Sequence, residues 1–430
     1  MRQRIVDCEI LDPASGKRFW GYVEWEDGVI CEVGQAGPGE AGEVSAGVEL
    51  ISAHGNLLAP SFVDLYADFC EPGFEYRENI ASGSAAAAAG GYTHVLLRPD
   101  TDPCVDGEDT VRFVLEAGAK AGLVNVLPAG CLSRKLDGES LAEIGEMADA
   151  GVVALLEGDR YLKKGGFLRR CMEYGDNFHL PVILTNEDPT LVEGVVHEGL
   201  VSAISGLKTS PSVAEEVAVA RHIALAELTR AKTHLAKISS AASVRLIKDA
   251  KARGVPVTAS VAIHNLILND TSTLGYDPMF KIWPPARSEE DRKLLLEAVI
   301  DGTIDTIVSD HSPKATEDKE LEFDLAATGA LSIELVFPLL NKLVLAEELD
   351  LVSAIRAVTV GPRRFLGIAG GEIAKGQPAD LVVLDRNTDW ELDYFELRSR
   401  GRNTPFLGQR FVGRTYLTIN RGRVTFRRDG

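Results

Sequence analysis

The chain has 430 residues, a formal net charge of −19 and 45% apolar residues. This length suits one large barrel with an accessory domain, and the acidic balance argues against nucleic acid or an anionic membrane surface as a partner. No uncharged apolar run reaches about 18 residues, so we expect no membrane span. The first residues lack the apolar core of a secretory signal, and the six cysteines form no C-x-x-C pair. We therefore expect a cytoplasmic protein with reduced thiols.

The two ends of the chain have a β-like pattern. Strand-like runs alternate with Gly- and Pro-rich turns up to about residue 55, and the same pattern returns after Gly371. The expected strands are Ile5–Ile10, Arg18–Glu24, Val29–Val33, Asp380–Leu384 and Tyr416–Ile419. Because chain termini often lie close together, we predict that residues 1–55 and 371–430 form one small β domain.

Residues 56–370 alternate apolar strand-like runs with helical stretches. The expected strands are Leu57–Leu65, Thr93–Arg98, Val124–Pro128, Val152–Leu156, Pro181–Leu184, Thr233–Ile238, Val255–Ala262 and Thr306–Val308. The clearest expected helices are Arg77–Ala89, Ser212–Ala231, Ala241–Arg253, Glu289–Ile300, Gly329–Leu345 and Leu351–Val358. Eight strands that alternate with helices predict an α/β protein with a (β/α)8 TIM-type barrel.

Several motifs in this region resemble those of the dihydroorotases, the cyclic-amide hydrolases of pyrimidine synthesis in the amidohydrolase superfamily. The retained motif residues are Phe69, Glu71, Pro72, Gly73, Pro99, Thr101, Pro103, the run Asp310-His311-Ser312-Pro313 and the segment Arg402–Phe406. The resemblance covers roughly residues 50 to 425. It implies a barrel whose active site lies at the carboxyl ends of the strands, with one or two divalent metals, typically zinc, that activate a water.

The positions that would hold the metals do not carry the family's residues. Tyr66 and Asp68 stand where the family has its His-x-His pair, and Thr185 and Lys237 stand at two further histidine positions. Two acidic residues complete the set, namely Glu157, near the carboxylate or lysine position of the fourth strand, and Asp310, the one retained ligand and proton shuttle. Because a protonated lysine repels a divalent cation, we expect no metal and no other cofactor here.

The positions that would recognise the substrate are changed as well. Cys70 replaces the arginine that would hold the substrate carboxylate, and Asp100 replaces an asparagine. Trp283 stands at another asparagine position and could fill the pocket, while Lys314 adds a cation near the mouth. The resemblance therefore implies a vestigial pocket rather than a competent one.

Three interpretations of the acidic residues remain open. Asp310 could act as a general base, or it could be a buried carboxylate that pairs with Lys237. Asp68, Glu157 and Asp310 could instead form a carboxylate-only site for magnesium or calcium, with Lys237 as a competing charge.

The leading hypothesis for function follows from the resemblance. Dihydroorotase homologues without a competent metal site occur in the family as structural or regulatory partners of aspartate transcarbamoylase, so we expect a non-catalytic, oligomeric protein with that partner. One alternative is an active dihydroorotase or other cyclic amidohydrolase with a remodelled site. A second is a metal-free enzyme or small-molecule-binding protein that uses the lysine and carboxylates of the pocket.

Overall fold

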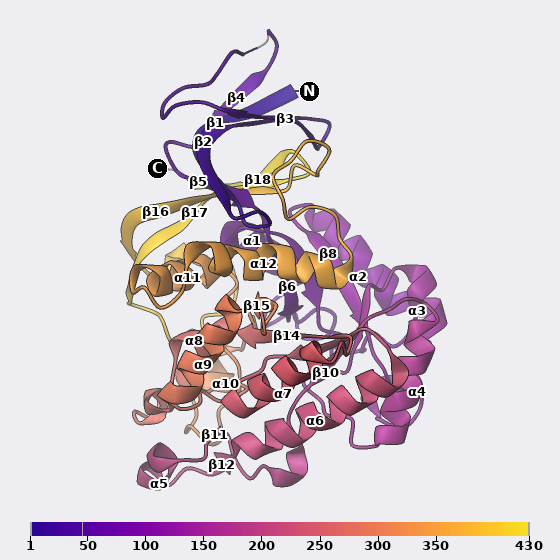
Figure 1. Cartoon of the computed structure of the whole chain (residues 1–430). Coiled ribbons are helices and arrows are strands. Elements are labelled where there is room, and N and C mark those ends of the chain that lie inside the picture. Colours follow the sequence, from indigo (N-terminus) through magenta and orange to yellow (C-terminus); the bar gives the residue numbers. More distant parts are fainter. Residues whose placement is uncertain (1, 45, 429–430) are drawn as a thin grey trace.

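The computed structural model describes residues 2–44 and 46–428 and contains two large sheets. One sheet is built from both ends of the chain and lies above the second, which is wrapped by helices (Figure 1). The expected (β/α)8 barrel with a small β domain from the chain ends is confirmed.

The sheet of the small domain brings together strands that are distant in sequence. Its order is β18-β17-β16-β5-β1-β2-β3, with β4 paired to β1. The strands are β1 (Arg2–Asp12), β2 (Lys17–Glu26), β3 (Val29–Gln35), β4 (Glu49–Ser52), β5 (Leu57–Pro60), β16 (Leu381–Glu391), β17 (Arg410–Asn420) and β18 (Arg423–Arg427). A core of its own surrounds Trp25, whose indole Nε1 donates to the Gly422 carbonyl at 3.1 Å and so joins the two ends of the chain.

The second sheet is parallel and almost closed. Its order is β15-β14-β13-β10-β9-β8-β7-β6, and a bridge between Ala67 and His311 joins its first and last strands. The strands are β6 (Phe62–Ala67), β7 (Tyr92–Leu97), β8 (Asn125–Gly130), β9 (Ala154–Leu156), β10 (Val182–Thr185), β13 (Thr233–Ala236), β14 (Val257–Ala262) and β15 (Thr306–Val308). Both faces of these strands are buried, as expected for a barrel covered by helices.

Helices cover the outside of the barrel (Figure 1). They are α1 (Ile80–Gly90), α2 (Glu108–Ala121), α3 (Ile144–Ala150), α4 (Gly165–Asp176), α6 (Ser212–Thr229), α7 (Ala241–Ala252), α8 (Ile263–Ile267), α9 (Glu289–Ile300), α11 (Val336–Leu345) and α12 (Leu351–Leu366). Smaller elements on the strand-end loops are β11 (Val196–His197), α5 (Leu200–Ser205), β12 (Thr209–Ser210) and α10 (Thr316–Lys319). Among the residues described, no helix is both long and apolar enough to cross a bilayer.

The structure corrects three of the predicted elements. The apolar run Leu57–Leu65 is two strands rather than one, because β5 pairs with β1 and β16 in the small domain, whereas β6 opens the barrel. The helix predicted from Gly329 begins only at Val336, since the preceding backbone bonds to neighbouring segments, as in the contact of Leu331 N with the Asn403 carbonyl. The helix predicted to end at Val358 continues to Leu366.

A buried arginine holds the junction between the two sheets. Ser61 separates β5 from β6, and Arg363 on α12 donates to its carbonyl at 2.7 Å and to its hydroxyl at 2.9 Å. Arg363 is 1% exposed, and this burial lowers the pKa of its guanidinium to about 10, which keeps it charged at neutral pH. The helix that closes the barrel therefore also fixes the point where the chain passes from one sheet to the other.

We predict that Arg363→Ala lowers the free energy of unfolding by about 3 kcal/mol, because it leaves the Ser61 carbonyl buried without its partner. Denaturant unfolding at neutral pH measures this difference. Arg364→Ala is the matched control, since Arg364 is the next residue on the same helix and is exposed; its effect should stay within about 0.5 kcal/mol. Equal effects of the two substitutions would contradict the assignment.

Candidate functional site at the mouth of the barrel

Lys237 lies at the centre of the carboxyl-terminal face of the barrel. It follows β13, and its side chain is 2% exposed. Its Nζ lies 2.9 Å from Asp310 Oδ1 and 3.0 Å from Asp159 Oδ1, and it donates to the Trp283 carbonyl at 3.2 Å. An ammonium has three N–H donors, and these three acceptors satisfy them. The pairing of Lys237 with Asp310 expected from the sequence is present.

Two aromatic rings complete the surroundings of this ammonium. Nζ of Lys237 lies 4.5 Å from the centroid of the Tyr66 ring and 4.4 Å from that of Trp283. Both distances are in the range of favourable cation–π contacts. The Trp283 indole also donates to Glu187 Oε1 at 2.8 Å, which fixes the ring over the lysine.

A second cation lies beside the first. Arg98 follows β7, and its guanidinium binds Asp159 Oδ2 at 2.6 Å and Asp100 through Nε at 3.0 Å. Asp159 therefore bridges the two cations, and its Oδ1 also accepts from the Tyr66 hydroxyl at 2.9 Å. The mouth of the barrel thus contains a connected network of two cations and three carboxylates.

The environment shifts the pKa values of the two carboxylates beside Lys237 in opposite directions. Burial raises the pKa of Asp310 to about 6, although the positive charge of Lys237 acts against this shift. Burial also acts to raise the pKa of Asp159, but Arg98 and Lys237 together outweigh it and hold that pKa below its ordinary value. Carboxylates with separated pKa values can take different roles in acid–base chemistry.

The network lines a small pocket with a volume of about 190 Å³. Its lining residues are Arg98, Asp159, Lys237, Trp283, Asp310, Ser312, Thr328 and Gly329. Of the residues proposed from the sequence, Lys237, Trp283 and Asp310 line this pocket directly, and Trp283 covers Lys237 as a bulky pocket residue would. Two others act behind the pocket, since Asp100 binds Arg98 and Thr185 donates to the Gly158 carbonyl at 2.7 Å.

Four further proposed site residues neither line this pocket nor belong to the network around Lys237. Glu157 is turned away and accepts from the backbone N–H groups of Leu132 and Ser133, each at 3.0 Å. Asp68 accepts from the Cys70 backbone N–H at 2.7 Å. The Cys70 thiol is buried 3.9 Å from the Pro313 carbonyl, and Lys314 is not part of the lining.

Of the three carboxylates that the sequence suggested for a metal site, Asp310 lines this pocket, whereas Asp68 and Glu157 do not. Nowhere in residues 2–44 and 46–428 do three or more His, Cys, Asp or Glu side chains gather as a metal would require. At the barrel mouth a lysine ammonium lies within hydrogen-bond distance of Asp310 and Asp159. Zinc prefers neutral imidazole, thiolate and carboxylate donors, so this set of side chains does not fit it.

Sequence reasoning missed the two residues that organise the network with Lys237. Asp159 lies two residues beyond Glu157, and Arg98 directly follows β7. A signal for both was present, because each comes at the carboxyl end of a barrel strand, where functional side chains converge.

Comparisons with known proteins agree with this architecture. The family model described as "Dihydro-orotase-like" matches residues 55–243. A dihydroorotase from Anaeromyxobacter dehalogenans is 42% identical over 423 residues, which cover 98% of this chain and 96% of that protein. A dihydroorotase from Syntrophotalea carbinolica is 40% identical, with 99% of each chain covered.

A solved structure gives the same fold. The L-hydantoinase (dihydropyrimidinase) from Arthrobacter aurescens superposes with a TM-score of 0.87 at 22% identity, and the match covers 100% of this chain and 96% of that one. Fold and site thus define a (β/α)8 barrel with an ion-pair network at its mouth. The full-length identity of about 40% goes further: the chain belongs to the dihydroorotase-like family.

We predict that Lys237→Met raises the pKa of Asp310 above 6, because the substitution removes the positive charge that opposes the effect of burial. A raised carboxyl pKa stabilises the folded state at pH values below the unfolded pKa, and this contribution is lost as the pH rises through the folded pKa. In the wild type the loss should be complete just above pH 6, whereas in the variant it should continue to higher pH.

Titration of the protein labelled with ¹³C at aspartate carboxyls measures this pKa. Asp310→Asn identifies the signal. Lys251→Met is the control, since Lys251 forms a partly exposed ion pair with Asp305 at 2.6 Å and does not line the pocket. An Asp310 pKa that stays the same in Lys237→Met would contradict the electrostatic role of Lys237.

Proposed function

We propose that this chain is a dihydroorotase homologue of pyrimidine biosynthesis that does not hydrolyse the dihydroorotate ring and acts as a structural or regulatory partner of aspartate transcarbamoylase. The observation that carries the first part is the position of Lys237, whose Nζ is bound to Asp310 and Asp159 at 2.9 and 3.0 Å. The partner is the one that the resemblance to non-catalytic members of the family implies.

The charge at the barrel mouth supports the loss of hydrolysis. Cyclic-amide hydrolysis needs a water whose pKa is lowered, and divalent metals supply this effect in metallohydrolases. Lys237 binds one of the two carboxylate oxygens of Asp310, and its positive charge opposes the approach of another cation. Arg98 engages the substituted Asp100 rather than facing the pocket alone, so its charge is already compensated. We therefore propose a pocket without a resident metal.

A second candidate function rests on one specific feature of the same pocket. Asp310 has a pKa raised to about 6 by burial and lies against a lysine, in a pocket of about 190 Å³ that contains Arg98 as well. Such a combination can bind a small anion or transfer a proton without a metal. Loss of binding or turnover in Asp310→Asn and Lys237→Met, with an identified ligand, would favour this candidate over a purely structural role.

We predict that the purified protein holds less than about 0.1 equivalent of zinc after incubation with the metal and dialysis, and that it gives no dihydroorotate hydrolysis, because Lys237 opposes metal at the site. Elemental analysis and a hydrolysis assay on the same sample measure both. The dihydroorotase from Anaeromyxobacter dehalogenans is the positive control. Stoichiometric zinc together with turnover would replace the proposal with an active, remodelled amidohydrolase.

The partner is tested separately. Mixed with aspartate transcarbamoylase from the same organism, the chain is expected to co-elute in size-exclusion chromatography as a defined complex and to change the stability or activity of that enzyme. The Anaeromyxobacter dihydroorotase in place of this chain controls for non-specific association. Separate elution at micromolar concentrations of both proteins would contradict the partnership while leaving the result on zinc and turnover in force.

A further inference from the structure

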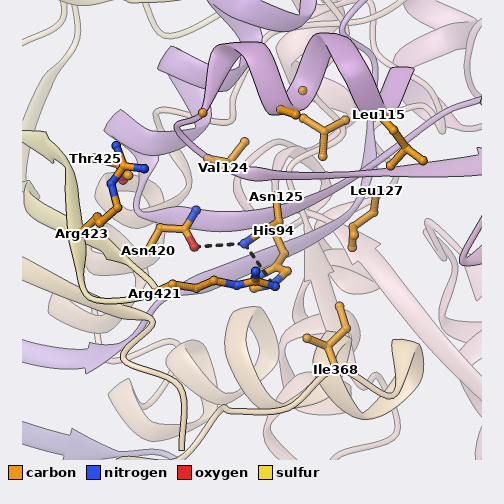
Figure 2. Close-up of a pocket in the computed structure, with 14 residues that line it drawn as sticks. His94, Leu115, Val124, Asn125, Leu127, Ile368, Asn420, Arg421, Arg423 and Thr425 are labelled. Carbon is orange, nitrogen blue, oxygen red and sulfur yellow. Dashed lines mark hydrogen bonds between the residues drawn. The ribbon is translucent and has the colours of Figure 1, made fainter. Parts of the chain in front are cut away.

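A second and larger pocket lies at the opposite end of the barrel, where the barrel meets the small β domain. Its volume is about 520 Å³, which is within the usual range of small-molecule sites. It is enclosed by the carboxyl-terminal half of α2, the first residues of β8, one residue of β7, Ile368 beyond α12, and the turn and first strand residues of the β17–β18 hairpin. Figure 2 shows these residues around the opening.

The charge of this pocket is of one sign. Arg421 and Arg423 contribute guanidinium groups, and among the residues that the structure describes the lining contains neither aspartate nor glutamate. Within residues 2–44 and 46–428, neither guanidinium forms a hydrogen bond or ion pair with another side chain. Both side chains are exposed to solvent at the rim of the cavity, so their charges are accessible to a ligand that enters it.

The fold does not explain why arginine stands at position 421. Asn420 and Arg423 face each other across the hairpin, so Arg421 and Gly422 form a two-residue turn in which both have positive φ, 47° and 76°. Turns of this kind favour Asn, Asp or Gly at the first position. The backbone N–H of Arg421 donates to Asp380 Oδ1 at 2.7 Å, which holds this strained residue in place. The turn is therefore anchored by its backbone, and the Arg421 side chain is left for another purpose.

A set of hydrogen-bonded polar side chains lies beside the two arginines. Asn125 donates to the Thr93 carbonyl at 2.9 Å and to Asn420 Oδ1 at 3.0 Å, and it lies 3.2 Å from His94 Nε2. Asn420 in turn donates to the Leu123 carbonyl at 3.2 Å. This chain of bonds joins the barrel to the hairpin that carries the arginines, so the pocket is already formed without a ligand (Figure 2).

The remaining wall is apolar. Leu115, Val124, Leu127 and Ile368 line it, and in Figure 2 Leu115, Leu127 and Ile368 lie on the side away from Arg423. A guanidinium binds phosphate through two parallel hydrogen bonds, and an apolar wall accepts a ring or hydrocarbon. A ligand that satisfies both sides carries a phosphate at one end and an uncharged planar or apolar group at the other.

We propose that this pocket is a binding site for a small phosphate-bearing metabolite, with Arg421 and Arg423 on the phosphate and the Leu115–Ile368 side on its planar or apolar part. The site bridges the barrel and the small domain, and it is independent of the network around Lys237 and of the proposed function. A ligand held there would stabilise the contact between the two domains, because it binds residues of both only in the folded state.

Isothermal titration calorimetry on the full chain tests the site with three probes: a nucleoside monophosphate, its parent nucleoside and inorganic phosphate. The monophosphate should bind more tightly than either fragment, since only it reaches both sides of the pocket. Arg423→Gln and the double variant Arg421→Gln/Arg423→Gln should each weaken its binding by about tenfold or more. Ala119→Trp, at an exposed lining position on α2, should block the pocket without disturbing the core.

Arg427→Gln is the matched control, because Arg427 lies on the same hairpin, is exposed and does not line the pocket. It should leave the affinity unchanged, and so should Lys237→Met at the other end of the barrel. Absence of binding of the monophosphate up to about 1 mM, equal binding of the nucleoside, or equal loss in Arg427→Gln would each overturn the proposal.

Discussion

The positive charge of Lys237 must be neutralised where it lies, and much of the barrel mouth is arranged around that requirement. The carboxyl ends of eight parallel strands converge on a small region, so a lysine at the end of one strand is brought close to the ends of the others. Removing one partner from a buried ion pair typically costs about 3–5 kcal/mol, because the other charge is left uncompensated. Asp310 and Asp159 meet this requirement, and the two aromatic rings exclude water from the ammonium.

The requirement for charge neutralisation extends from Lys237 to Arg98. Asp159 cannot serve one cation alone, since its second oxygen binds Arg98, and Arg98 in turn needs Asp100. Asp100, which reads in isolation as a residue that repels a carboxylate substrate, is thus explained by its arginine partner. Loss of Lys237 would leave Asp310 without its cation, and loss of Arg98 would do the same for Asp100. Tyr66, Asp100 and Lys237 thus belong to one network in which the charges compensate one another.

The sequence predicted the barrel well because its signal is repetitive. Apolar runs buried on both faces, separated by amphipathic helices, are typical of this fold. The break at Ser61 could not be found in this way. Leu57–Pro60 and Phe62–Ala67 are equally apolar, and periodicity does not tell which sheet a strand joins. That choice depends on the pairing of β5 with β1 and β16 and on Arg363, more than 300 residues later in the chain.

The site was predictable only in part, for a related reason. Lys237 and Asp310 follow their strands directly, so their direction into the barrel mouth followed from the positions that they share with the family. Glu157 and Asp159 lie just beyond β9, where the alternation of a strand no longer fixes which side chain faces the centre. The hydroxyl and backbone N–H of Ser133 donate to the Glu157 carboxylate. Asp159, and not Glu157, therefore binds Lys237 and Arg98.

The two ends of the barrel differ in whether their cationic side chains are paired with carboxylates. At the carboxyl-terminal mouth, each cation has a carboxylate within hydrogen-bond distance, so the network is satisfied within the chain itself. At the seam with the small domain, two guanidinium groups face a cavity whose lining has no acidic residue. Stability alone does not require arginine at Arg421 or Arg423, because the hairpin is held by its ladder and by Asp380. Both side chains are exposed, so water solvates their charges and either guanidinium is accessible to an anion. The proposed site at the domain seam therefore differs from the barrel mouth, where the cations already bind carboxylates of the chain.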